Sequence, residues 1–126
     1  MQFLTLIHID PALLATLPQE EYDRLMRGCF EKADAFRDAG CLLDSQQLED
    51  PATARTLRVR EGLSRVTDGP FAETREFLAG FNLIEAESMD AAMAIAREFP
   101  WARFGSIEVR PVRDMQGVRS RVGAPA

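Results

Sequence analysis

The chain has 126 residues, of which 46% are hydrophobic and 28% charged, and its formal charge at pH 7 is −5. This length suffices for one domain with its own core, and no apolar run is long enough to span a bilayer. The acidic balance argues against nucleic acid as a partner. The N-terminus lacks the features of a signal peptide, so we expect a cytoplasmic protein with one domain over residues 1–112 and a tail over 113–126.

The first predicted element is a strand over residues 2–9, which stops at the loop signal Asp10-Pro11. Because side chains alternate between the two faces of a strand, this segment has apolar residues on both of them. One face would carry Phe3, Thr5, Ile7 and Ile9, and the other Leu4, Leu6 and His8. We therefore expect both faces to be covered.

A helix is predicted within residues 16–40, where apolar side chains recur at helical spacing. Thr16 and Gln19 form a capping-box pattern, and Pro18 suits the first turn of a helix. Gly40 stands where a C-terminal cap is expected.

Extended segments follow this helix. Residues 41–50 predict a strand, and residues 54–61 and 62–69 predict a hairpin that turns at Glu61-Gly62. After a corner at residues 68–70, residues 77–86 predict a largely buried strand, in which Gly80 marks a bulge or a close approach of two backbones.

A second helix is predicted over residues 88–99, with Ser88 as its N-cap and an end before Pro100. The last predicted strand covers residues 106–112, and a loose tail follows it.

This order of elements predicts an α+β fold of the ferredoxin-like type, β-α-β-β-α-β, with an inserted β-hairpin. Its antiparallel sheet would carry both helices on one face. The other face is then open, and the simplest cover is the same face of a second copy, which gives a homodimer that pairs as a dimeric α/β barrel.

Metal and cofactor chemistry has little support in the sequence. The chain has two cysteines, Cys29 and Cys41, without a CxxC pairing, and His8 is its only histidine. It also lacks a phosphate loop, a dinucleotide fingerprint and a nucleophile elbow. We expect no metal and no cofactor.

Arginines are concentrated in the predicted hairpin, at positions 55, 58, 60 and 65. Two interpretations stay open: this segment is either a solvated strand face or a rim that attracts anions.

The segment "VTDGPFAETREFLAGF" resembles the signature of DGPF proteins within the YCII-related family, and "IEVRPV" is similar to the last strand of that family. The likeness extends over residues 2–112. It implies a ferredoxin-like fold that pairs into a dimeric α/β barrel, in a largely uncharacterised family for which activity is suspected from a recurrent His and Asp. The motif Asp corresponds to Asp68, whereas the histidine near the first helix has no counterpart, since that helix carries Tyr22 and Asp23.

Asp68 and His8 are the candidate catalytic residues. Asp68 would be a general acid or base if a pocket shifts its pKa, but its carboxylate could instead cap the Asp-Gly-Pro turn. His8 could relay protons, or be a hydrogen-bonded core residue.

Three further side chains are candidates for substrate binding: Glu73, Arg75 and Arg110. The first two could line a cleft with Asp68 or form a solvated surface, and Arg110 would point into a cavity if the open face closes over one. We expect a cofactor-free acid/base enzyme with a small organic substrate. The alternatives are a non-catalytic ligand-binding or regulatory module linked to sigma factors, which the family resemblance suggests, and a scaffold whose motif only shapes a dimer.

Overall fold

The computed structural model of the protein describes residues 1–125. Its main sheet is antiparallel, with four strands in the order β2-β5-β1-β6. Those strands are β1 (Gln2–Ile9), β2 (Leu42–Gln47), β5 (Phe77–Glu85) and β6 (Gly105–Pro111). Together with the two long helices, this order gives the ferredoxin-like α+β fold that the sequence predicts.

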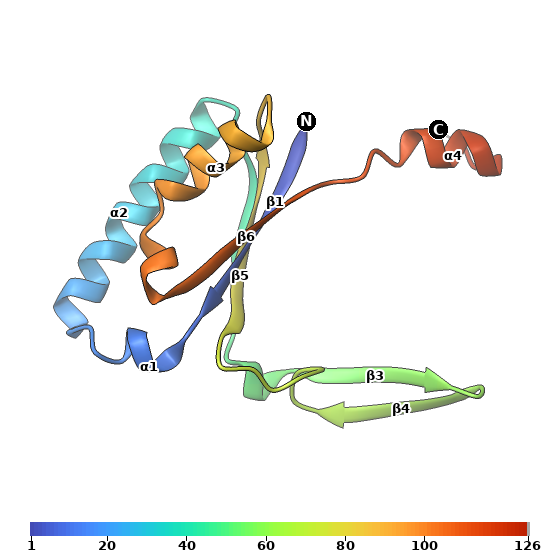
Figure 1. Cartoon of the computed structure of the whole chain (residues 1–126), viewed down its shortest axis with the longest axis horizontal. Helices are drawn as coiled ribbons and strands as arrows, with labels where there is room; N and C mark the ends of the chain where they lie inside the picture. Colours follow the sequence, from blue (N-terminus) through green and yellow to red (C-terminus); the bar gives the residue numbers. More distant parts are fainter. Residues whose placement is uncertain (126) are drawn as a thin grey trace.

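Both long helices lie on one face of this sheet (Figure 1). They are α2 (Gln19–Asp38) and α3 (Met89–Arg97). The core between helices and sheet contains Phe3, Leu42, Ile84 and Ala92, all at most 3% exposed. Burial of these apolar side chains is the main favourable contribution to folding.

Strand β5 passes so close to β2 at Gly80 that a larger residue would not fit there. The pairing of β1 with β5 shifts register between Ile7 and His8, next to Gly80. A Cβ atom on Gly80 would lie 2.7 Å from the carbonyl oxygen of Gln46 on β2. The predicted bulge and the predicted close approach are both confirmed.

The start of α2 differs from the prediction. Its N-cap is Pro18, which makes no side-chain cap, so the expected capping box of Thr16 and Gln19 is wrong. A short helix, α1 (Pro11–Leu14), precedes it, and the hydroxyl of Thr16 donates to the carbonyl of Leu13 at 2.7 Å. Thr16 therefore closes the end of α1 instead of opening α2. The N-cap role of Ser88 in α3 is confirmed, since its hydroxyl accepts from the amide of Ala91.

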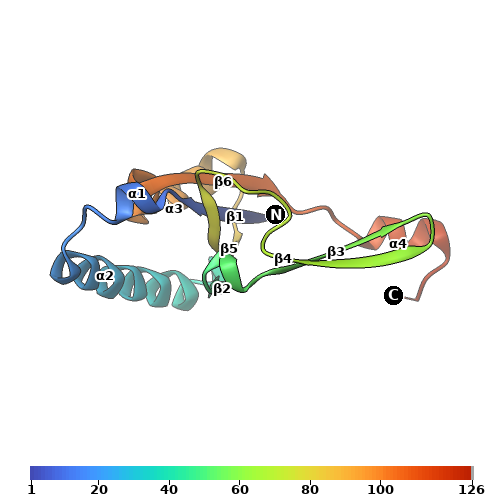
Figure 2. The same ribbon diagram turned by 90° about the horizontal axis from the view of Figure 1, so that it is seen from below.

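The inserted hairpin forms a separate two-stranded sheet from β3 (Arg55–Arg60) and β4 (Leu63–Asp68). Its turn has positive φ at both Glu61 and Gly62, as in the type I′ turns that favour hairpins. It follows a short 3-10 helix, η1 (Pro51–Thr53). The hairpin extends away from the main sheet, on the side opposite α2 and α3 (Figures 1 and 2).

The C-terminal segment also leaves the sheet on that side (Figure 1). A second 3-10 helix, η2 (Pro100–Phe104), precedes β6, and the segment after β6 contains helix α4 (Gln116–Val122) where a loose tail was expected. Gly123 ends α4 in the left-handed conformation, with φ of 74°. None of the helices in the described part of the chain combines the length and apolarity that crossing a membrane requires.

Candidate active site

The sheet face away from α2 and α3, which we call the open face, is apolar along its centre. Residues directly opposite each other on paired strands share a face. Leu4 of β1 therefore lies beside Leu83 of β5, and Leu6 lies beside Phe81. All four side chains are partly exposed. Within residues 1–125 no helix covers this apolar centre, and the carboxylates of Asp44 and Glu85 lie on the same face.

A row of polar groups lies along one side of this apolar centre. His8 shares the open face with Ser106 on the neighbouring strand β6, and Glu108 and Arg110 follow on the same face. The imidazole Nε2 of His8 lies 3.7 Å from Oε1 of Glu108, and the guanidinium Nε of Arg110 lies 3.9 Å from Oε2 of the same carboxylate. Glu108 thus stands between His8 and Arg110 on the open face, and the role of Arg110 in a substrate cavity stays a prediction.

The Asp68 carboxylate makes no contribution to the turn that follows it. The corner is held by the amide of Gly69, which donates to the carbonyl of Ala54 at 2.7 Å, and by the Thr56 hydroxyl, which donates to the carbonyl of Gly69 at 2.9 Å. The Asp68 side chain is 93% exposed and has the guanidinium of Arg55 3.7 Å away. The turn-capping interpretation is therefore wrong, and the one partner described for this carboxylate within residues 1–125 is the exposed guanidinium of Arg55.

Asp68 and His8 belong to different sheets. The contacts described for residues 1–125 join His8 to Glu108 and Asp68 to Arg55, and none joins His8 to Asp68. The hairpin leaves the body at the end of the sheet where β1 finishes (Figure 1), and His8 and Asp68 lie near the ends of β1 and β4 respectively. Their use as one catalytic pair stays a prediction.

The segment 69–76, which we call the DGPF loop, is tied to the sheet at its far end. Nε of Arg75 donates to Oδ2 of Asp10 at 2.9 Å, and the Ser106 hydroxyl donates to Oε1 of Glu76 at 2.6 Å. The second contact brings Glu76 next to the polar row, because Ser106 lies opposite His8. Glu73 is exposed on the same loop.

Two of these contacts were missed from the sequence. The Asp10-Pro11 pair predicts only a loop, but the Asp10 residue is 4% exposed, caps α1 through the amide of Ala12 and binds Arg75. The Asp-Pro pair at the start of α1 is a normal N-cap signal that could have identified the cap. Ser106 gave no signal, because only the register of β6 against β1 places it beside His8.

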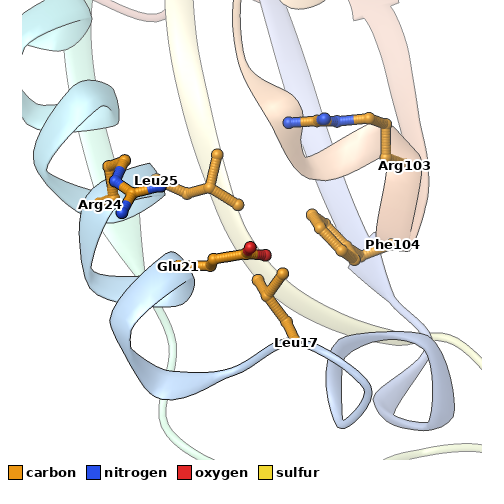
Figure 3. A pocket seen from close by; sticks show the side chains of 6 residues that line it. All are labelled: Leu17, Glu21, Arg24, Leu25, Arg103 and Phe104. Atoms are coloured by element: carbon orange, nitrogen blue, oxygen red, sulfur yellow. The ribbon is translucent and has the colours of Figure 1, made fainter.

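Two shallow hollows lie on the helix side of the molecule. Figure 3 shows the first, of about 150 Å³, which α2 and η2 line together with the segment before α2. Its lining combines apolar and charged side chains: Leu17, Glu21, Arg24, Leu25, Arg103 and Phe104. Pockets for drug-sized ligands start at roughly 300 Å³, so this hollow is small for an organic substrate.

The second hollow, of about 210 Å³, lies against Cys29. Burial raises the pKa of the Cys29 thiol from its usual value of 9.0 to about 11. The thiolate is the reactive form, so Cys29 is a poor nucleophile at neutral pH. Among residues 1–125, the His, Cys, Asp and Glu side chains form no group of three able to hold a metal ion.

The fold and the open face define a small ferredoxin-like α+β protein with a polar row on an apolar sheet. The model of the YCII-related domain matches residues 1–116, and the chain therefore belongs to the YCII-related family. It is 38% identical over 114 residues to an uncharacterised protein of Rhizobium meliloti (strain 1021), an alignment that covers 89% of this chain and 92% of that one.

A solved structure shares the fold. It is 5-chloro-2-hydroxyhydroquinone dehydrochlorinase (TftG) from Burkholderia phenoliruptrix AC1100, in complex with 2,5-dihydroxybenzoquinone. The TM-score is 0.51 at 16% sequence identity, and the match covers 90% of this chain and 94% of the other. That enzyme, which binds a small ring compound, has the same fold as this chain.

Proposed function

We propose that this protein is a cofactor-free acid/base catalyst that acts on a small organic molecule at the open face of its sheet. The observation that carries the proposal is the row of His8, Glu108 and Arg110 along one side of the apolar centre of the open face. Ligand sites combine apolar walls with a few polar groups that fix orientation, and the open face has this composition.

The site needs a cover, and a second copy of the chain supplies it. Contiguous exposed apolar patches mark interaction surfaces, and symmetric dimers bury the same patch of both subunits. Two open faces stacked on each other would enclose a pocket between two sheets. The active form is therefore a homodimer.

Proton transfer would fall to His8 and Asp68. Histidine is the side chain best suited to give and take a proton in acid/base catalysis, and Oε1 of Glu108, 3.7 Å from Nε2 of His8, would orient the imidazole. The Asp68 carboxylate makes none of the hydrogen bonds described for its turn, so it would be the second proton-transfer group. Arg110 would bind an acidic oxygen of the substrate, while Arg75 and Glu73 on the DGPF loop would contact its other end.

The substrate class that we propose is a small ring compound with ionised oxygens. Arg110 on the edge strand β6 favours an anionic oxygen there, on the other side of β1 from Asp44 and Glu85. The leucines and Phe81 favour a flat apolar body. The ligand of the dehydrochlorinase, 2,5-dihydroxybenzoquinone, belongs to this class. That likeness is an analogy between folds, since one fold hosts many functions, and it serves here to choose a probe.

A ligand-binding module without catalysis, with a regulatory role, is the second candidate. One observation favours it: the Asp68 side chain is 93% exposed, whereas catalytic carboxylates are usually enclosed where burial shifts their pKa. Such a module would use the same open face and the same Arg110, but would leave its ligand unchanged.

Two NMR experiments with 2,5-dihydroxybenzoquinone test the proposal. The ring signal of His8 is unique in the chain, and we expect it to shift and saturate on addition of the probe. Glu108→Gln should weaken this effect, whereas Glu98→Gln, which removes a carboxylate paired with Lys32 far from the open face, should not. An unchanged His8 signal at millimolar probe would refute binding at the open face.

Exchange of the probe's ring protons in D2O separates the two candidates. A general acid/base group typically contributes roughly 10²- to 10⁴-fold to rate. If the protein is an enzyme of this class, it should accelerate the exchange, and His8→Gln or Asp68→Asn should reduce the acceleration at least tenfold. Binding without acceleration would favour the regulatory module.

A further inference from the structure

The hairpin β3–β4 has an apolar face that no other segment of residues 1–125 covers. Leu57 lies directly opposite Val66, and Val59 is on the same face. Their exposed fractions are 64%, 62% and 55%. The hairpin projects from the body into the space in front of the open face (Figures 1 and 2), so these side chains would face water in a single chain.

The opposite face of the hairpin concentrates positive charge. Arg58 lies directly opposite Arg65, and like charges at such a pair are unfavourable unless an anionic group lies nearby. The salt bridges described for residues 1–125 give neither arginine a carboxylate partner. Arg58 instead donates to the backbone carbonyl of Phe71 at 3.0 Å.

The C-terminal segment 112–125 also combines exposed apolar side chains with arginines. It leaves the body on the same side as the hairpin, and the two segments stand at opposite ends of the open face (Figure 1). Its exposed apolar residues are Val112, Met115 and Val122. We call the hairpin (residues 55–68) and this segment the two arms.

The charge of the arms is complementary to that of the body. The arms contain seven arginines and three carboxylates, and the rest of the chain contains eight basic and seventeen acidic side chains. The open face itself carries Asp44 and Glu85 besides Glu108, against one guanidinium at Arg110. A second copy of the same chain therefore offers the arms both an apolar surface and an acidic one.

We propose that the β3–β4 hairpin is an exchanged arm, which reaches past its own sheet and packs its Leu57, Val59 and Val66 face on the body of a second copy. A copy stacked on the open face would lie between the two arms, and two-fold symmetry would place its own arms around the first. Arg58 and Arg65 are on the opposite face of the hairpin and lie outside this contact; the positive charge of the arms would attract the acidic body of the partner at longer range. The hairpin closes one side of the pocket of the other protomer, so each site is incomplete without the partner.

This inference rests on the homodimer of the proposed function, and isotope-filtered NMR tests the two separately. In a mixture of ¹³C-labelled and unlabelled protein, we expect intermolecular contacts from the methyl groups of Leu57, Val59 and Val66 to residues outside 55–68 of the other chain. Contacts between the leucines of two open faces, with none from the hairpin, would uphold the dimer and overturn the exchanged arm. Contacts only between two hairpins would overturn it as well.

Charged substitutions give an independent measurement. Leu57→Glu and Val66→Glu should each raise the dimer dissociation constant at least tenfold in sedimentation experiments. The matched control is Thr67→Glu, on the other face of the hairpin, which should change it less than twofold. Since all three sites are exposed, the circular dichroism spectrum should stay that of the wild type. A Leu57→Glu variant that dimerises like the wild type would overturn the arm, whereas a wild type that stays monomeric at millimolar concentration would overturn the homodimer as well.

Discussion

The Nε atom of Arg75 donates to Oδ2 of Asp10 at 2.9 Å, and this bond joins two groups in very different surroundings. The Asp10 side chain is 6% exposed and the Arg75 side chain 84% exposed. The other oxygen of Asp10 accepts from the amide of Ala12 at 2.9 Å. The carboxylate thus caps α1 and anchors the DGPF loop at the same time.

The two partners of this bond should differ in their effect on stability. Asp10→Ala removes the helix cap and the anchor together, and we expect it to lower the free energy of unfolding by about 1–2 kcal/mol. Arg75→Gln should cost less than about 1 kcal/mol, because the guanidinium is largely in water and a water molecule can replace it at Oδ2. Urea denaturation measures both. An Arg75→Gln variant as unstable as Asp10→Ala would contradict this distinction.

Substitutions at two glycines should have opposite signs. A Cβ atom on Gly105 would overlap the backbone carbonyl oxygen of His8, and it would lie 2.9 Å from the Cα of Ile9. Gly105→Ala should destabilise the protein by about 1–3 kcal/mol, as overpacking does, and should shift the ring signal of His8. Gly28→Ala on α2 meets no atom within 4 Å and should stabilise by up to about 1 kcal/mol. Equal stability of the two variants would contradict the close approach of β6 to β1.

The raised pKa of Cys29 predicts a pH dependence of stability. Below pH 9.0 the thiol is protonated in both states and contributes nothing. Between pH 9.0 and about 11 the unfolded chain loses this proton and the folded chain keeps it, so unfolding becomes more favourable as pH rises. The loss of stability from pH 8 to pH 10 should therefore be smaller in Cys29→Ala than in the wild type. Equal losses in the two proteins would show that burial does not affect this thiol.

The corner after β4 should tolerate the loss of its carboxylate but not of a hydroxyl. Amide exchange at Gly69 reports on this corner, because that amide donates to the carbonyl of Ala54. We expect Asp68→Asn to leave the exchange rate unchanged. Thr56→Val removes the hydroxyl that binds the Gly69 carbonyl and should accelerate it severalfold. Faster exchange in Asp68→Asn would restore the turn-capping role of the carboxylate.

Local patterns predicted the elements well. The Glu61-Gly62 turn, the Ser88 cap and the tight position of Gly80 follow from the chemistry of a few neighbouring residues, and the structure confirms all three. The predicted capping box at Thr16 is wrong because the Thr16 hydroxyl instead donates to the carbonyl of Leu13 at the end of α1. The two faces of β1 could be read from alternation alone.

The site was harder to predict because its contacts join distant parts of the chain. Arg75 meets Asp10, 65 residues away, and Ser106 meets Glu76, 30 residues away. Such pairs depend on the register of β6 and on the path of the DGPF loop, which local periodicity does not encode. The sequence likewise predicted a hairpin, but its projection from the body depends on the residues that join it to β2 and β5.

The position of the hairpin has a consequence for the lifetime of the protein. Trypsin cleaves after arginine, and the hairpin presents four arginines on strands that the body does not shield. In a packed assembly these bonds would be covered, whereas in a dilute sample they would be open to attack. Nicking within residues 55–65 should therefore be fastest at low protein concentration, so that digestion rate becomes a simple measure of assembly.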